Sequence, residues 1–224
     1  MPIFLIFFIL FVIWLNVKTK RGQNNNSEWD TDYWEKEREA NFVRRKDISG
    51  LDYITISEDE LPFSDTAEGE EKYREDQVRR ILSSKIINLS GMSNTDIKLT
   101  YGTANFPELS KYDQNYLLLI RNLGMWGSYL HHNCDGQDER ARQILERAIE
   151  LGSDIRDTYV SLAEIYLDAG QPEKVQELIH HVEKSDFDLK DSLLRSLKNL
   201  LNTLEHQPLY GLSLASLHSP LRSS

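Results

Sequence analysis

The densest group of potential metal ligands in this 224-residue chain is the run His131, His132, Cys134 and Asp135. Imidazole, thiolate and carboxylate are the donors that zinc and related transition ions take from proteins. Neighbouring side chains on a helix point about 100° apart, however, so His131 and His132 do not form the i, i+4 pair that chelates one ion. We therefore interpret the run as a helix end entering a turn at Gly136, and we expect no metal site and no cofactor.

Strings typical of catalytic sites do not occur in the sequence. There is no phosphate-binding G-x-x-x-x-G-K-S loop, no G-x-S-x-G nucleophile elbow and no H-E-x-x-H zinc motif. A second histidine pair, His180 and His181, repeats the unfavourable spacing of the first. We therefore expect neither enzymatic activity nor a small-molecule substrate. The alternative is an enzyme or metal-binding protein that uses His131, His132 and Cys134.

The segments that carry these residues repeat with a period of 34. Between residues 123 and 188, similar side chains recur 34 positions apart: Met125 and Tyr159, His132 and Tyr166, Gly136 and Gly170, Ala141 and Val175, Leu145 and Ile179, Ala148 and Val182. Such a period is typical of stacked helix pairs that form a binding surface.

Helical spacing of the apolar residues predicts the elements of this region. The expected helices cover residues 112–132, 138–151, 156–169 and 172–184. Leucines at steps of four, three and four residues predict a last helix, which would cap the stack: Leu193, Leu197, Leu200 and Leu204. The fold class predicted is all-α.

Residues 156–188 resemble one tetratricopeptide repeat, a helix-turn-helix unit of 34 residues. The features that carry the resemblance are a large residue, a leucine, a small residue, a tyrosine and a turn glycine: Tyr159, Leu162, Ala163, Tyr166 and Gly170. The resemblance implies that the two helices of a pair cross at the small residue. In the preceding unit Ser128 and Tyr129 replace the leucine and the small residue, so Gly124 and Gly127 indicate a shifted contact.

The resemblance also implies where a ligand would bind, because the family's groove is lined by first-helix positions. The corresponding residues are Leu123, Trp126, Leu130, Asn133, Asp157, Val160, Glu164, Leu167 and Asp168. They lack the lysines that clamp the carboxylate tails of chaperones. A mixed apolar and acidic groove favours an amphipathic peptide that carries basic residues. The other interpretation of Trp126 and Leu130 is ordinary core.

An acidic segment precedes the repeats. Residues 52–71 contain eight carboxylates and no basic side chain, and Leu61 and Phe63 are embedded among them. We consider three roles for the segment: a solvated loop, an internal cover of the groove, or a docking segment that recruits the partner. Residues 51–56, at the start of this segment, are β-prone. We interpret them as an extended stretch that lies on helices, because no second strand is predicted to pair with them.

Further helices are expected in the N-terminal part of the folded region. An amphipathic helix is predicted over residues 32–46, and another over 70–89 with Gly91 as its end. A shorter helix should begin at Ser93 or Asn94 and stop at Gly102.

The first 17 residues predict an uncleaved membrane anchor. Residues 3–15 are an unbroken apolar run, preceded by no basic residue and followed by no small-residue cleavage site. Lys18, Lys20 and Arg21 follow the run, and the positive-inside bias places that flank and the downstream domain in the cytoplasm. Secretion or surface display is the alternative.

Charge and cysteine content narrow the classes of partner. The formal net charge is −10, and residues 1–21 contribute +3, so the remainder carries −13. A nucleic-acid binder needs a basic stripe, and none of the expected helices has one. The single cysteine, Cys134, cannot form an internal disulfide and suits a reducing compartment.

These observations predict five parts along the chain. They are an anchor (1–17), a basic flank and polar linker (18–31), a helical region with the acidic segment (32–110), the repeats with their capping helix (111–205), and a loosely ordered tail (206–224). This plan resembles bacterial inner-membrane tetratricopeptide proteins, some of which regulate lipopolysaccharide assembly. Those carry a four-cysteine metal module that one cysteine cannot supply, so that role is not carried over. The expected function is a membrane-tethered scaffold or adaptor that binds a protein or peptide.

Overall fold

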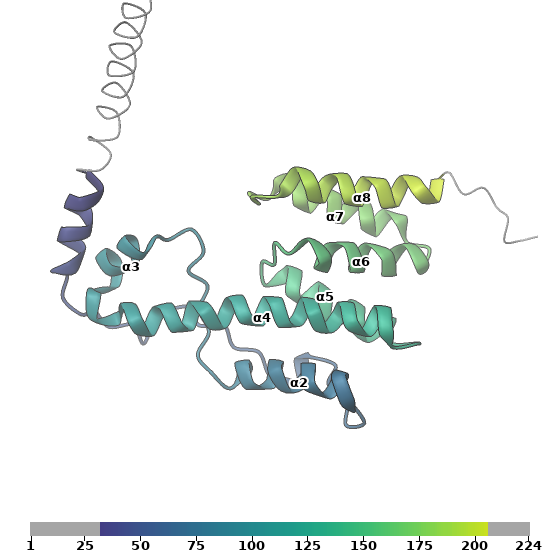
Figure 1. Ribbon diagram of the computed structural model, residues 1–224, viewed down its shortest axis with the longest axis horizontal. Helices are drawn as coiled ribbons and strands as arrows, with labels where there is room; N and C mark the ends of the chain where they lie inside the picture. Colours follow the sequence, from purple (N-terminus) through teal and green to yellow (C-terminus); the bar gives the residue numbers. More distant parts are fainter. Residues whose placement is uncertain (1–31, 206–224) are drawn as a thin grey trace, which may run out of the picture. The chain divides into compact units, whose positions relative to one another are not determined.

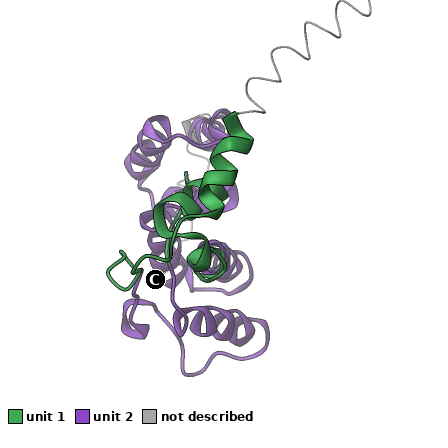
Figure 2. Cartoon of the chain, turned by 90° about the vertical axis from the view of Figure 1, so that its left-hand side faces the viewer, with its two compact units in different colours: residues 1–53, 87–114 green, residues 54–86, 115–224 purple. Residues whose placement is uncertain are grey.

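The computed structural model describes residues 32–205, and within this range the chain is helical and contains no β-strand (Figure 1). The predicted all-α class is confirmed. The chain divides into two compact units. Within the described range, unit 1 comprises residues 32–53 and 87–114, and unit 2 comprises residues 54–86 and 115–205 (Figure 2). The region expected as one N-terminal part, 32–110, is thus shared between the two units.

Unit 1 contains a helix over residues 32–41, α3 (Asn94–Tyr101), the 3₁₀ turn η2 (Thr103–Asn105) and the first part of α4 (Phe106–Asn133). A capping box starts α3: the Ser93 amide donates to Asp96 Oδ2 at 3.0 Å, and the Asp96 amide donates to Ser93 Oγ at 3.2 Å. Gly102 ends it with φ +92°, and a Cβ there would collide with the Arg44 carbonyl. The predicted start and stop of this helix are confirmed.

The core of unit 1 is small and is supplemented by a buried amide. Its buried apolar residues are Ile48, Ile87, Leu89, Ile97 and Leu109. Asn105 is fully buried and accepts a hydrogen bond from Arg45 Nε at 2.8 Å. Its side-chain nitrogen donates to the carbonyls of Lys46 and Tyr101 at 2.7 and 2.8 Å. Every polar atom of this side chain therefore has a partner, as burial requires.

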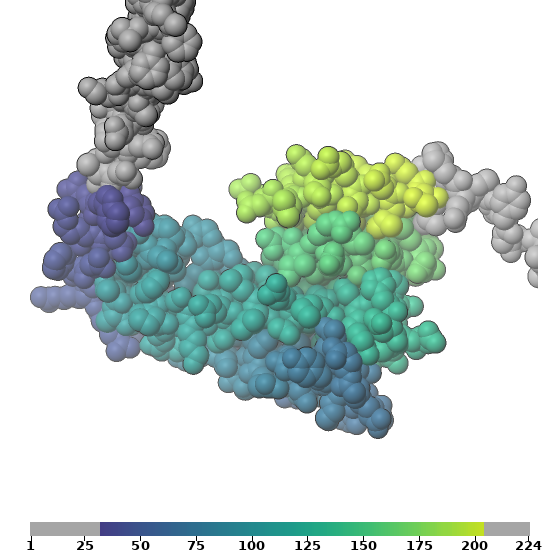
Figure 3. Space-filling model, viewed as in Figure 1, coloured from purple at the N-terminus to yellow at the C-terminus, as the bar shows by residue number. Residues whose placement is uncertain are grey.

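Unit 2 is a stack of helices with a covering segment at each end. Its elements are η1 (Glu58–Glu60), α2 (Gly69–Leu82), the second part of α4, α5 (Asp138–Glu150), α6 (Arg156–Asp168), α7 (Pro172–Lys184) and α8 (Lys190–Glu205). Helix α6 packs against α5, α7 and α8, and α8 also packs against α7. Helices α2 and α8 lie on opposite sides of this stack (Figures 1 and 3). The helices predicted from residue 138 onward are found at the expected positions.

Two predicted helices end earlier than expected. The first stops at residue 41 instead of 46, and α2 stops at Leu82 instead of continuing to residue 89. The reason for the second is visible at Ile86 and Ile87, which are 1% and 4% exposed. Ile86 belongs to the core of unit 2 and Ile87 to that of unit 1. Each isoleucine is thus buried by residues far away in the sequence, and the helical spacing within residues 70–89 does not reveal this burial.

The first helix pair makes its close contact at a glycine, as the sequence indicated. A Cβ built on Gly127 of α4 would lie 2.6 Å from Leu145 Cγ and 3.2 Å from the carbonyl oxygen of Ala141, both on α5. Only glycine permits this approach of the two helices. In the second pair Ala163 is fully buried, as expected of the small position.

The β-prone segment is extended and forms no strand, as predicted. Within it, the Ile54 amide donates to the Ile86 carbonyl at 2.9 Å. Between residues 32 and 205, no helix is both long and apolar enough to cross a membrane. The predicted anchor (1–17), linker (18–31) and tail (206–224) lie outside the described range.

Candidate functional site

Helices α4 and α6, the first helices of the two pairs, lie against each other in unit 2. Ser128 Oγ and Ser161 Oγ are 2.9 Å apart and share a hydrogen bond. One turn earlier, a Cβ on Gly124 would lie only 2.5 Å from Thr158 Oγ1. Small residues at these positions allow the close approach. The first-helix positions of both pairs therefore share one surface within unit 2.

The larger pocket of this surface has a volume of about 500 Å³. Its walls include Arg74 from α2, Arg121, Met125 and His132 from α4, and Asp157 from α6. The Met125 side chain is 49% exposed, so the pocket presents an apolar surface beside charged groups. A pocket of this size is large enough for side chains of a bound peptide.

Some polar groups of the larger pocket already have a partner within the protein, and others do not. Arg74 forms an ion pair with Glu70 at 2.8 Å and lies 4.8 Å from the centre of the Tyr129 ring. Arg121 is exposed and makes no ion pair with another described residue. Thr158 Oγ1 is buried and has no hydrogen-bond partner in the described part of the chain. A ligand could therefore gain a contact at Arg121 without breaking an existing ion pair, whereas Thr158 is fully buried and out of its reach.

A second pocket of about 340 Å³ follows on the same surface. It is bordered by Glu164, Leu167 and Asp168, three residues of the predicted groove. His131 and His132 complete this side of it, and His132 also borders the larger pocket. The two pockets therefore meet at His132, near the C-terminal end of α4. The larger pocket is lined by two arginines and Asp157, and the smaller one by two carboxylates.

The other residues of the predicted groove have different locations. Three are fully buried core residues: Leu123, Trp126 and Leu130. Asn133 and Asp157 border the larger pocket, and Val160 is half-buried. Trp126 and Leu130 are therefore core residues, as the alternative interpretation states. Their side chains are not available to a ligand in this structure.

The acidic segment covers this buried part of α4. The Phe63 ring stacks on Trp126 with centroids 5.1 Å apart and an angle of 20° between planes. Leu61 is only 4% exposed and belongs to the core of unit 2. The Arg79 guanidinium lies over the Phe63 ring, 3.9 Å from its centroid. Neither Leu61 nor Phe63 is presented to a partner in this arrangement.

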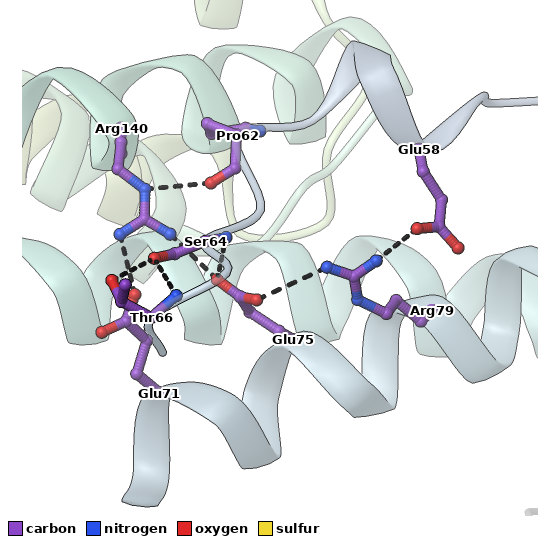
Figure 4. Close-up of polar contacts among 8 residues, drawn as sticks. All are labelled: Glu58, Pro62, Ser64, Thr66, Glu71, Glu75, Arg79 and Arg140. Atoms are coloured by element: carbon purple, nitrogen blue, oxygen red, sulfur yellow. Dashed lines mark hydrogen bonds and ion pairs between the residues drawn. The ribbon is translucent and has the colours of Figure 1, made fainter. Parts of the chain in front are cut away.

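Arg140 of α5 fastens the segment to the stack (Figure 4). Its Nε donates to the Pro62 carbonyl at 2.9 Å, and its two terminal nitrogens donate to Glu71 at 2.7 Å and Glu75 at 2.9 Å. The Ser64 amide donates to the same Glu75 oxygen at 3.0 Å. One guanidinium thus joins the segment, α2 and α5 through directional, charge-assisted bonds.

Glu75 is the buried centre of this network, with a relative exposure of 2%. Burial raises the pKa of its carboxyl, while the Ser64 amide and the Arg140 charge act in the opposite direction. Arg79 lies 3.8 Å from Glu75 and also pairs with Glu58 of the acidic segment (Figure 4). The sequence concealed these pairs, because the acidic segment has no basic residue and its counter-charges come from α2 and α5.

The histidine run is rearranged relative to the sequence expectation. His131 and His132 do come together with a carboxylate, but it is Glu164 of α6, which lies 3.8 Å from the Nε2 atom of each. The expectation that neighbouring histidines diverge is therefore wrong here, since their ring centroids are 4.6 Å apart. Cys134 is outside the cluster and packs against the core of unit 2. One sequence signal for the proximity of Glu164 to the histidines was the 34-residue period, because it aligns Glu164 of α6 with Leu130 of α4, the residue before His131.

Unit 2 thus presents a surface with two adjoining pockets of unlike charge, supported by a core that the acidic segment covers. No protein-family model matches this chain, and neither a curated protein sequence nor a solved structure matches it.

Proposed function

We propose that this protein is a membrane-tethered helical-repeat adaptor, which binds a segment of a partner protein on the α4–α6 surface of unit 2. The observation that carries the proposal is the pocket of about 500 Å³ between first-helix residues, in which Arg121 is exposed and has no ion pair with another described residue. In tetratricopeptide repeats, which residues 123–188 resemble, the same positions line the ligand groove.

The arrangement of the helices supports the assignment to repeats. We infer that α4 with α5 and α6 with α7 are two tetratricopeptide-like pairs. Two such pairs cannot bury their outer faces alone. Here residues 54–86 pack on the first pair and α8 packs on the second, so each end of the stack is covered. The first-helix surface remains accessible at its two pockets.

The charges of the two pockets indicate the chemistry of the partner. Arg121 beside the exposed Met125 suits a carboxylate next to an apolar side chain. Glu164 and Asp168 at the second pocket suit a basic side chain. The sequence favoured a basic amphipathic peptide, and the larger pocket adds an acidic residue to that description. We therefore propose a segment that carries an acidic, an apolar and a basic residue in succession.

Binding can be tested with a photo-crosslinking residue in the full-length protein in native membranes. Met125 is the position to replace, and His180 on the exposed face of α7 is the matched control. We expect one discrete adduct from Met125 and none from His180, and loss of the adduct when Arg121→Glu is added. Adducts of equal yield at both positions, or an adduct insensitive to Arg121→Glu, would contradict the proposed surface.

Attachment to the membrane rests on the sequence of residues 1–21, in which an apolar run is followed by Lys18, Lys20 and Arg21. We propose that it is a single-pass anchor with the folded part in the cytoplasm. An alkaline phosphatase fused to the C-terminus should then be inactive, and a fluorescent protein fused there should be bright. Placing three lysines before the run and neutralising the three basic residues should shift the population toward active phosphatase. An active phosphatase in the unaltered protein would overturn the orientation.

A further inference from the structure

Three potential metal-binding side chains converge where the C-terminal end of α4 meets α6. They are His131, His132 and Glu164, and one donor atom from each lies within 4.8 Å of the others. The Nε2 atoms of both histidines are 3.8 Å from the same oxygen, Glu164 Oε2. This separation is too long for a hydrogen bond. It is close to the separation of two ligands that share one tetrahedral ion at about 2.0–2.2 Å from each.

Glu164 Oε2 is an acceptor without a donor. The atom is buried and has no hydrogen-bond partner among the described residues, although the whole side chain is 32% exposed. A buried carboxylate oxygen without a partner is unfavourable. A cation held between this oxygen and the two imidazoles would supply the missing interaction.

His131 is already oriented for coordination. Its Nδ1 lies 2.7 Å from Asp138 Oδ1, at the start of α5. A carboxylate only accepts hydrogen bonds, so His131 Nδ1 carries a proton, and in the neutral ring Nε2 then has its lone pair free for a metal ion. Metal-binding histidines commonly donate their other ring N–H to a carboxylate in this way, which fixes the tautomer and the ring orientation. The His131 side chain is 11% exposed, and this limits competition from water.

We propose that His131, His132 and Glu164 form a binding site for Zn²⁺, with Asp138 orienting His131. Two imidazoles and one carboxylate are a donor set found in zinc sites that keep a fourth position open. The three side chains border the pocket of about 340 Å³, so this position can be occupied by water or by an oxygen or nitrogen donor of a ligand. The site would join α4 to α6 independently of whether the surface binds a peptide.

The test uses the untagged full-length protein in detergent, stripped with a chelator and titrated with Zn²⁺ by calorimetry. We expect one ion per chain, verified by elemental analysis after gel filtration. His131→Asn and Glu164→Gln should each weaken binding at least 100-fold. Asp138→Asn, which removes only the orienting contact, should weaken it about 10–100-fold.

The chain contains its own matched control. His180 and His181 are also adjacent on a helix, both are exposed, and no carboxylate completes a cluster with them among the described residues. The double variant His180→Asn/His181→Asn should bind Zn²⁺ with unchanged affinity and stoichiometry. Thermal unfolding without metal serves to verify that each variant is folded.

Three outcomes would overturn the site. They are no binding by the unaltered protein, unchanged binding by Glu164→Gln, and a loss of binding in the control as large as in the cluster variants. A visible spectrum of the Co²⁺-loaded protein gives a second readout. Its tetrahedral bands should be present in the control and absent in Glu164→Gln.

Discussion

The two helix pairs of unit 2 follow the same 34-residue spacing, but equivalent positions in the two pairs differ in burial. Trp126 of α4 and Val160 of α6 are 34 apart, yet the tryptophan is fully buried and the valine is half-buried. Arg140 of α5 and Lys174 of α7 are also equivalent. Arg140 binds two glutamates, whereas Lys174 is exposed and, among the described residues, forms one ion pair, with Glu177 at 2.9 Å.

The difference arises from what covers each pair. The first pair packs against residues 54–86, which bring Phe63 onto Trp126 and the carboxylates of α2 onto Arg140. The second pair packs against α8. A repeat position therefore has no fixed burial, and its energetic importance depends on the neighbouring element. Substitutions at equivalent positions of the two pairs can test this dependence.

The largest difference is expected between Trp126→Ala and Val160→Ala. Removing the buried indole leaves a cavity beside Phe63, so we expect a loss of about 3–5 kcal/mol in the free energy of unfolding. Val160 is half-buried and loses only two methyl groups, so we expect less than about 1 kcal/mol. Urea unfolding followed by circular dichroism measures both. Similar losses would mean that the segment over Trp126 is not in place in solution.

The second comparison is Arg140→Met with Lys174→Met. Loss of Arg140 leaves Glu75 as a buried charge with one partner fewer, and we expect a cost of about 2–4 kcal/mol at neutral pH. The lower end allows for the 22% exposure of the Arg140 side chain. Lys174 is exposed, and its substitution should change the free energy of unfolding by less than about 0.5 kcal/mol.

The cost of Arg140→Met should depend on pH with a defined sign. Burial raises the pKa of Glu75 in the folded protein, and removal of the Arg140 charge should raise it further. The folded state then binds a proton more tightly than the unfolded state, so stability increases as the pH falls through the folded pKa. The deficit of the variant should therefore shrink between neutral pH and about pH 4.5. A deficit that grows on acidification would contradict the buried charge as its cause.

The close contacts of the two pairs provide the third comparison. Gly127→Ala should cost about 1–3 kcal/mol, because the new methyl group meets Leu145 and the Ala141 carbonyl, although alanine is the better helix former. Ala163→Leu in the second pair should also cost about 1–3 kcal/mol by overpacking. The control is Ala169→Leu at an exposed position, which should stay within about 0.5 kcal/mol. Equal effects at Ala163 and Ala169 would show that the register of the second pair is wrong.

The smallest effects concern two equivalent surface glutamates. Hydrogen bonds from Arg142 and Gln143 lower the pKa of Glu139 to about 2, whereas Glu173 has no ion pair among the described residues. Glu139 is 65% exposed, so Glu139→Gln should cost less than about 1 kcal/mol. Because the folded pKa is lowered, this contribution is present above about pH 4.3 and is lost as the pH falls toward 2. Glu173→Gln should stay within about 0.5 kcal/mol at neutral pH, and a loss larger than that of Glu139→Gln would contradict the assignment.

Local rules account for the parts of the fold that the sequence predicted. Apolar spacing located the helices from residue 138 onward, Ser93 predicted the start of α3, and Gly102 predicted its end. Helical periodicity, capping and the positive φ of glycine each act within a few residues of the chain, so a single sequence contains them. The same rules failed at the end of α2, where the extended path of Ile86 and Ile87 follows from the two cores that they enter.

The candidate site was predictable only in part. The first-helix positions placed Glu164, Leu167 and Asp168 on the accessible surface, and all three border a pocket. Trp126 was assigned to the same surface, but an apolar face in a sequence does not say which element covers it. Only the tertiary structure places Phe63 there.

The sequence alone predicts the helices from residue 138 onward, the 34-residue period and the acidic character of residues 52–71. The tertiary structure decided that the acidic segment packs on α4 and α5, and that Glu164 joins a histidine pair 32 and 33 positions earlier in the chain. The physical reason is the range of the interactions. Backbone propensities act within one helical turn, whereas burial and ion pairing depend on side chains that only folding brings within a few ångströms of each other.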